Sequence, residues 1–421
     1  MKLPQGLRSL EHRDFRLFIS GQLVSLIGTW MQSVAQAWLV LQLTDSAFKL
    51  GVIGALQFGP MFLFSFLAGA VADRVHKRRM IIATQTALML QAFVLGALCW
   101  SGHARYWHVA VLAACYGLAN TFDVPVRQAF VVEMVGKQDL PSAIALNSAV
   151  FNGARMIGPA VAGILIARYG VAPAFALNGL SFLAVILALL AMQAQGLPSP
   201  HPRGSVRDEI AAGLRYARDT PIVLLILSAL LCVSLFIVNH NVMVPLLARH
   251  VLHEGAHGLG MLMAGLGLGA VAGSLAMAIW GRCPPLRLLL ATAIISSALT
   301  LLLGAVSRLA PALAVLAGVG FFQVVFMASC NTMLQAEAPD HLRGRVLSIY
   351  AFVFAGVAPI GSLLMGTLAQ CFGTSVAYGV AGAAGLLGLL VLTWASEQSG
   401  GRVTAAAVIG ENIDVAPARP A

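Results

Sequence analysis

The sequence predicts an all-α integral membrane protein whose twelve transmembrane helices form two pseudo-symmetric six-helix bundles. Three observations support this fold class. The 421 residues are 59% hydrophobic and only 10% charged, whereas a soluble domain carries about a quarter charged residues. The apolar residues come in runs of roughly 20 or more, the length of a helix that crosses a bilayer, without the sustained alternation of strands. The longest polar stretch divides these runs six and six.

Charged or turn-rich breaks separate the twelve apolar segments. In chain order the segments cover residues 15–43, 47–72, 80–100, 107–134, 141–168, 172–194, 220–248, 257–281, 286–306, 310–336, 343–371 and 374–396. The run that follows the basic N-terminus is too long for the core of a signal peptide, so we expect it to be retained as the first span.

Residues 195–209, QGLPSPHPRGSVRDE, form the longest polar stretch between spans. They are rich in Pro, Gly and charge, which is typical of a linker. We therefore expect a six-helix bundle over 1–194, a cytoplasmic linker over 195–219, a second six-helix bundle over 220–396 and a disordered cytoplasmic tail over 397–421.

The net charge of +10 has an uneven distribution along the chain. The bases gather in short loops such as DRVHKRR (73–79) and not on a face studded with aromatic residues, so nucleic acid is not an expected partner. With the N-terminus inside, the cytoplasmic segments hold nineteen Lys and Arg, and the opposite side holds five. This bias predicts a multi-pass protein with both termini in the cytoplasm.

The two halves of the chain resemble each other. MIGPAVAGILIARYG (156–170) aligns with PIGSLLMGTLAQCFG (359–373), so that Gly158 falls on Gly361 and Gly163 on Gly366. This similarity indicates a duplicated six-helix unit, a form of internal symmetry on which many transporters are built.

The sequence gives no sign of a metal, a cofactor or an enzyme active site. The six cysteines are scattered, without CxxC or Cys/His spacing. GLGLGAVAG (265–273) imitates a dinucleotide-binding motif, but it lies inside an apolar span with no preceding strand and no acid about 20 residues on. No phosphate-binding loop or pairing of nucleophile and base is visible, so neither ATP as the direct energy source nor catalysis is expected.

The stretch GAVADRVHKRRM (69–80) resembles the cytoplasmic loop motif of the major facilitator superfamily, Gly-x-Leu-Ala-Asp-Arg-x-Gly-Arg-Lys. Val71 replaces the Leu of the motif and His76 replaces its second Gly, and the matching residues are Gly69, Ala72, Asp73, Arg74, Lys77 and Arg78. The resemblance implies a cytoplasmic gate in which Asp73 accepts hydrogen bonds near the start of span 11, at 341–345. The alternative is that the bases only fix the topology.

ARMIGPAVAG (154–163) in span 5 resembles the antiporter motif of the same superfamily. Gly158, Pro159 and Gly163 match that motif, while alanines replace two further glycines. Small residues let helices approach closely and a proline leaves a bend. The resemblance favours export over uptake, and ordinary close packing is the alternative.

The first six spans, and more loosely the last six, look like the bacterial branch that includes the enterobactin exporter and related drug and siderophore exporters. The resemblance implies a secondary active transporter of the bacterial inner membrane that exports a small organic molecule by proton antiport and alternating access. A siderophore is the favoured cargo, and multidrug or antibiotic efflux is the alternative. A proton-coupled importer and a non-transport receptor are less favoured. The expected partners are the cargo, protons, the bilayer, and an outer-membrane or periplasmic export partner.

In that superfamily, spans 1, 4, 7 and 10 line the central cavity, so the resemblance implies which side chains face the cargo. These candidates are Thr29, Gln32, Gln36, Asn120, Asn239, Asn241, Gln323 and Asn331. His240 is the one histidine of ten that lies plainly within a span, and histidine can titrate near neutral pH. It is therefore a candidate for proton coupling, with a hydrogen-bonded packing role as the alternative.

Asp123 is the one carboxylate well inside a predicted span. An ionisable group in a bilayer is costly, so Asp123 is a candidate functional residue. At a rise of about 1.5 Å per residue, Asp123 lies about 16 Å from the cytoplasmic hairpin at 135–140. Arg155 lies about 21 Å from that hairpin and Arg127 about 10 Å.

Two partners for Asp123 compete. Arg127 follows it by four residues on one helix, but Pro125 between them disturbs the local geometry. Arg155 would bridge two neighbouring spans near mid-membrane. We favour Arg155, which leaves Arg127 to the cytoplasmic gate; protonation of Asp123 would then weaken the pair and change the charge of the cavity. The alternative is an ion pair that only locks the hairpin.

Overall fold

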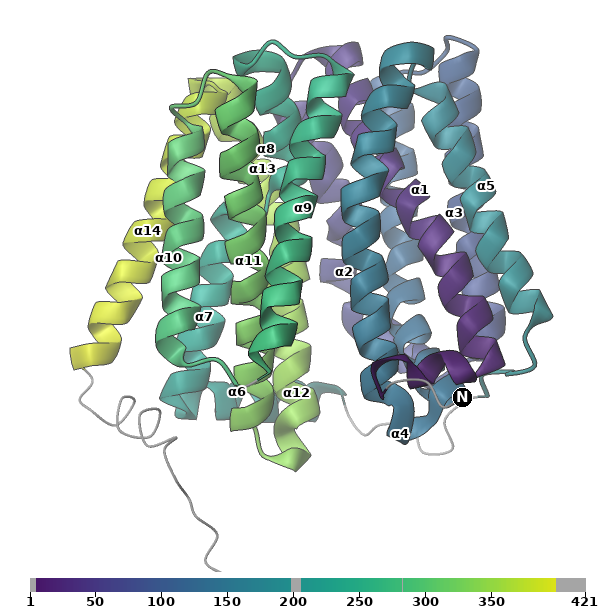
Figure 1. Cartoon of the computed structure of the whole chain (residues 1–421), viewed down its shortest axis with the longest axis vertical. Helices are drawn as coiled ribbons and strands as arrows, with labels where there is room; N and C mark the ends of the chain where they lie inside the picture. The colour runs from purple at the N-terminus through teal and green to yellow at the C-terminus, as the bar shows by residue number, and fades with distance from the viewer. Residues whose placement is uncertain (1–4, 198–205, 282, 399–421) are drawn as a thin grey trace, which may run out of the picture.

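The computed structural model describes residues 5–197, 206–281 and 283–398, which are almost entirely helical (Figure 1). The elements are η1 (Gln5–Glu11), α1 (Arg13–Thr44), α2 (Ala47–Arg74), α3 (Lys77–Trp100), α4 (Tyr106–Tyr169), α5 (Ala172–Ala191), α6 (Val206–Asp219), α7 (Pro221–Phe236), α8 (His240–Leu246), η2 (Leu247–Val251), α9 (Ala256–Trp280), α10 (Leu286–Leu303), α11 (Leu309–Glu337), α12 (Asp340–Ala351), η3 (Phe352–Gly356), α13 (Ala358–Phe372) and α14 (Thr374–Gln398). Residues 198–205 of the expected linker and 399–421 of the expected tail lie outside the described residues.

Eleven helices of the described part are long and apolar enough to cross a membrane. One of them, α4, has 64 residues and would measure about 96 Å if it were straight, roughly three times the apolar thickness of a bilayer. Its backbone is non-helical at Gly136, where φ is 71°. Glycine adopts this left-handed conformation readily, so α4 consists of two arms that correspond to predicted spans 4 and 5.

Two further spans contain interruptions. Span 7 is divided into α7, α8 and the π-helical η2, with the break at 237–239 just before His240. Span 11 is divided into α12, the π-helical η3 and α13. Broken helices and π-bulges in membrane proteins are frequent at functional sites, because they expose backbone groups and re-aim side chains.

The helices form two bundles that lie side by side (Figure 1). Helices α1 to α5 make the first bundle, and α7 to α14 make the second. The segment 206–219, expected as part of the linker, forms α6, which lies against α12; a Cβ atom built on Gly213 would be 3.1 Å from Ile349. The all-helical, two-bundle fold class is therefore confirmed.

Glycines at equivalent positions of the repeat make equivalent contacts between the bundles. A Cβ atom built on Gly163 of α4 would lie 2.9 Å from the Cα of Gly260 in α9. A Cβ built on Gly366 of α13 would likewise lie 2.9 Å from the Cα of Gly51 in α2. Only small residues allow backbones to approach this closely. The pseudo-symmetry that the sequence repeat predicted is thus present in the packing.

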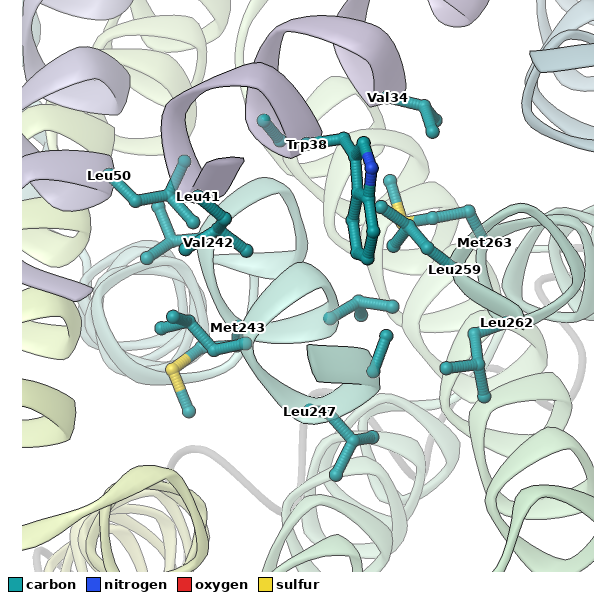
Figure 2. Close-up of a cluster of buried hydrophobic side chains, with 14 of the residues drawn as sticks. Val34, Trp38, Leu41, Leu50, Val242, Met243, Leu247, Leu259, Leu262 and Met263 are labelled. Atoms are coloured by element: carbon teal, nitrogen blue, oxygen red, sulfur yellow. The ribbon is translucent and has the colours of Figure 1, made fainter. Parts of the chain in front are cut away.

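The bundles are joined most closely at one end of the molecule. The N-terminus, α6 and α12 lie at the bottom of Figure 1, which we call the linker end; the opposite end is the far end. At the far end, a cluster of buried apolar side chains from both bundles includes Trp38 and Leu41 of α1 and Met243 and Leu247 of the second bundle (Figure 2). This shared cluster seals the far end against water.

Polar contacts reinforce the far end. Arg249 Nε donates to Asp45 Oδ1 at 2.6 Å, and the Ser46 hydroxyl donates to Gln370 Oε1 at 2.8 Å, in both cases across the two bundles. The bundles are therefore joined at the far end.

Candidate transport site

Asp123 is fully buried inside the first bundle and has partners on two helices. The Thr84 hydroxyl and the Gln85 amide of α3 donate to Asp123 Oδ1 at 2.6 and 3.1 Å. The other carboxylate oxygen forms an ion pair with the Arg127 guanidinium. The carboxylate is therefore paired and hydrogen-bonded, as a buried charge must be.

The predicted pairing of Asp123 with Arg155 is wrong. Helix α4 keeps helical dihedral angles through Pro125, so Asp123 and Arg127 stay one turn apart on the same face. A proline removes one backbone hydrogen bond but does not change this spacing while the dihedral angles stay helical. The arginine expected to face the cytoplasmic gate is consequently occupied by the carboxylate.

Arg155 lies elsewhere, where four helices of both bundles meet. Its guanidinium carbon is 5.7 Å from the centre of the Trp30 ring of α1. On its other side, a Cβ built on Gly267 of α9 would be 2.8 Å from the Arg155 carbonyl oxygen. The guanidinium also interacts electrostatically with His240 of α8. Within the described part of the chain, Arg155 has no hydrogen-bond acceptor and no carboxylate partner.

His240 and its neighbours form the facing side of this region. His240 Nε2 lies 3.0 Å from Gln323 Oε1 of α11, and both side chains are buried. The amide nitrogen of Gln323 has no hydrogen-bond partner among the described residues. Asn239 instead donates to the Leu235 carbonyl oxygen of its own span at 2.7 Å, which satisfies a backbone group freed by the break between α7 and α8.

The two glutamines of α1 differ sharply. Gln32 donates to Gln91 of α3 at 3.0 Å and accepts from Asn178 of α5 at 2.7 Å, so it belongs to a polar network inside the first bundle. Gln36 is 2% exposed, yet neither atom of its amide has a partner in the described structure. Gln36 and Asn241 help to line a small pocket between the bundles. Gln36 and Asn241 therefore line the space between the bundles, whereas Gln32 lies inside the first bundle.

The remaining cavity candidates contact mainly their own helices. Asn120 donates to the Tyr116 carbonyl oxygen at 3.0 Å, and Asn331 accepts from Gln335 at 2.5 Å. Thr29 is half-buried. Sequence reasoning missed Thr84, Gln85, Gln91 and Asn178, although polar residues in apolar spans 3 and 6 were a usable signal.

The loop motif holds the first bundle together at the linker end. Lys77 forms an ion pair with Glu133 and donates to the Leu197 carbonyl oxygen at 2.5 Å, and Arg78 donates to the Leu190 carbonyl oxygen at 2.9 Å. His76, in place of the glycine of the motif, has φ of −68°, so this turn does not require glycine. Arg74 ends α2 and is exposed, Gly69 faces open space, and the side chain of Asp73 lies outside the described structure.

The antiporter motif lies where α4 packs against α1 and α9. A Cβ built on Gly158 would come within 2.6 Å of the Trp30 Cβ, and Gly163 faces Gly260 as described above. Pro159 lies inside the helix between them. These residues bring α4 close to α1 in its own bundle and to α9 in the second bundle. They thereby position Arg155, one turn before Gly158.

Comparison with known proteins finds transporters throughout. The family model described as "Transmembrane secretion effector" matches residues 5–402. The multidrug efflux pump Tap of Mycolicibacterium fortuitum is 29% identical over 85% of this chain and 89% of its own length. The staphyloferrin A transporter of Staphylococcus aureus is 25% identical over 87% of this chain and 92% of its own length. The enterobactin exporter EntS of Shigella boydii is 26% identical over 90% of this chain and 91% of its own length.

Solved structures of low sequence identity share the fold. A POT family transporter in complex with a thioalcohol-conjugated peptide superimposes with a TM-score of 0.74 at 10% identity, covering 92% of this chain and 96% of that one. A bacterial homologue of the human lysosomal transporter Spinster, in an inward-facing and unoccupied conformation, gives a TM-score of 0.69 at 12% identity, with coverage of 91% and 95%. These likenesses place the chain among proteins with the same two-bundle architecture.

Proposed function

The chain belongs to the transmembrane secretion effector family of the major facilitator superfamily, and on this premise we propose that it exports a siderophore across the bacterial inner membrane by proton antiport. The observation that carries the coupling proposal is Asp123, a fully buried carboxylate bound to α3 and α4. Two of the relatives named above export or transport siderophores, which supports the cargo.

The arrangement of the bundles supports alternating access. If the linker end faces the cytoplasm, as the distribution of bases predicts, the conformation described here is closed to the periplasm. Rocking of the bundles would part the contacts at the far end and close the linker end. Cargo taken up between the bundles from the cytoplasm would then leave on the other side.

In this proposal, the proton is carried by Asp123. An ionised Asp123 holds the Arg127 guanidinium next to it on α4. A proton arriving from the periplasmic side neutralises the carboxylate and releases Arg127, one turn nearer the linker end. The released guanidinium is then more stable in contact with water or with another acceptor, because a buried unpaired charge is unfavourable. This change favours the state that returns the proton to the cytoplasm.

Export can be tested in a strain that lacks the transporter gene but makes its own siderophore. Wild-type protein is expected to restore extracellular siderophore fully, and Asp123→Asn to restore only the part that leaves down the siderophore's own gradient. Asp139→Asn is the matched control, because Asp139 is a carboxylate on the same helix that pairs with His12 at the linker end, outside the proposed coupling and gate residues. Full export by Asp123→Asn would contradict the coupling role. Cargo accumulating inside vesicles of native orientation would indicate an importer instead.

Multidrug efflux is the second candidate function, favoured by the similarity to the Tap pump. It predicts that the deletion strain becomes sensitive to structurally unrelated drugs while its extracellular siderophore stays unchanged. Drug susceptibility and siderophore content measured on the same cultures therefore separate the two cargo classes.

The loop motif suggests a gate, in which Asp73 stabilises the state that is closed to the cytoplasm. Cysteines placed at positions 46 and 370, in a background without the native cysteines, would report closure of the far end, because Ser46 and Gln370 are in hydrogen-bond contact. Asp73→Asn is expected to raise the crosslinked fraction. An unchanged fraction would contradict the gate.

A further inference from the structure

Two charged side chains embedded in the first bundle, Arg127 and Lys77, each have a carboxylate partner. Arg127 is paired with Asp123, and Lys77 with Glu133. Arg155 differs, because its guanidinium has no acidic partner and no hydrogen-bond acceptor among the described residues. Arg155 is half-buried, and a cation without a counter-charge inside a membrane span is costly. A cation of this kind is expected where it has a functional role, and the simplest such role is to bind a ligand of opposite charge.

The surroundings of Arg155 are suited to a ligand that enters between the bundles. Trp30 lies against the guanidinium at 5.7 Å, and Phe151 meets Trp30 edge-on with 5.7 Å between ring centres. A cation over an aromatic face is held in a defined orientation. The aromatic pair also offers a flat apolar surface beside the charge.

The second bundle offers uncharged amide groups and the His240 imidazole toward this region. His240 interacts electrostatically with Arg155 and is bound to Gln323, which is 3% exposed and whose amide nitrogen has no acceptor in the described structure. The amide nitrogen is a donor and therefore suits an oxygen atom of a ligand. Among the described residues, no carboxylate pairs with Arg155, so the region favours an anionic ligand over a cationic one.

From these observations we propose that Arg155 and Trp30 form an anion-binding site for the cargo, which takes an organic molecule bearing a carboxylate or phenolate next to a planar group. The guanidinium binds the oxyanion through its fork of N–H groups, and the Trp30 ring packs against the planar part. This inference rests on the proposed export function and narrows its cargo to anions. Cationic amphipathic drugs would be repelled from the same position.

Binding of salicylate to the purified full-length protein tests the site, with salicylamide as its uncharged counterpart. Isothermal titration should give salicylate an affinity at least 10-fold higher than salicylamide. Arg155→Gln should remove this preference, and Arg155→Lys should keep part of it. Arg168→Gln is the matched control, because Arg168 lies exposed at the end of the same helix and should leave the preference unchanged. Equal affinities of wild-type protein for the two probes would overturn the proposal even if Arg155→Gln failed to fold.

Anionic lipid is the other source of an oxyanion at this position. The titration is therefore repeated in nanodiscs of phosphatidylcholine and in nanodiscs containing phosphatidylglycerol. A cargo site predicts the same salicylate affinity in both. Loss of salicylate binding in phosphatidylglycerol, dependent on Arg155, would assign the site to a lipid headgroup and overturn the cargo assignment.

The outcome is distinguishable from a failure of the proposed function. Salicylate preference without restored siderophore export would refute the export function and leave the anion site standing. Restored export by both the wild type and Arg155→Gln, with no salicylate preference, would refute only the site.

Discussion

Two charged positions on α4 differ in one respect that explains their different roles. Asp123 lies inside the first bundle and has Thr84, Gln85 and Arg127 as partners. Arg155 lies where the two bundles meet, and among the described residues it packs against the Trp30 ring and has no carboxylate partner. The Asp123 carboxylate thus has its counter-charge within its own bundle, whereas the Arg155 guanidinium has no carboxylate partner among the described residues. A charge without a counter-charge between the bundles is therefore a better indicator of the proposed cargo site than a polar side chain in a span.

The largest effect is expected when one partner of the satisfied pair is removed. Asp123→Asn leaves the Arg127 guanidinium buried without its counter-charge and should destabilise the protein by about 3–5 kcal/mol. Adding Arg127→Gln should recover more than half of this loss. Arg155→Gln should stay within about 1 kcal/mol of the wild type, because only a cation–π contact is lost. Thermal unfolding of the purified variants measures all three.

A destabilisation by Arg155→Gln as large as that by Asp123→Asn would break the comparison. It would mean that Arg155 has a structural partner and is no anchor for a ligand. The control Arg168→Gln should leave the unfolding temperature unchanged, since Arg168 is exposed at the end of α4.

The glutamines of α1 offer the same comparison on a smaller scale. Gln32→Leu leaves Gln91 and Asn178 without their shared partner and should destabilise the protein by about 1–3 kcal/mol. Gln36→Leu removes an amide that has no partner and should not destabilise it, but should lower the rate of cargo export. Unfolding temperatures and export rates of the two variants sharpen the distinction. Equal loss of stability in both would argue against it.

The smallest effect is expected at the exposed far end. The hydrogen bond from Arg249 holds the pKa of Asp45 below its usual value of 3.8. A carboxyl group with a lowered pKa contributes stability above pH 3.8 and loses it as the pH falls through the lowered value. The contribution of such an exposed pair is less than about 1 kcal/mol. Arg249→Gln should therefore cause a slight loss of stability at pH 7 that vanishes in strong acid, measured by chemical denaturation at both pH values.

A loss of stability that persists unchanged in strong acid would show that Arg249 acts through something other than Asp45. Its packing over Trp38, at 5.6 Å, is the contact that would then account for the effect.

Much of the fold could be predicted from the sequence, because membrane spans have a length and composition that soluble helices lack. The repeat also predicted Gly163 and Gly366 as equivalent residues, and both contact the other bundle. The Asp45–Arg249 contact could not be predicted in the same way. Its partners are 204 residues apart in sequence, and their contact depends on the orientation of the two bundles relative to each other.

The partner of Asp123 shows where the prediction of the site failed. Rise per residue gives the depth of Asp123 and Arg155, and the two depths are within one turn of each other. Depth does not say which way a side chain points around its helix, and the Arg155 guanidinium lies over the Trp30 ring, away from Asp123. For the same reason Gln32 and Gln36 were both assigned to the cavity, although Gln32 is taken up by its own bundle.

The coupling role of Asp123 is tested most directly by proton movement in proteoliposomes that contain a pH-sensitive dye. Addition of the siderophore to wild-type protein should drive protons across the membrane in the direction opposite to the cargo, and a protonophore should abolish the signal. Asp123→Asn should carry siderophore down its gradient without moving protons. A proton signal from Asp123→Asn equal to that of the wild type would contradict the account.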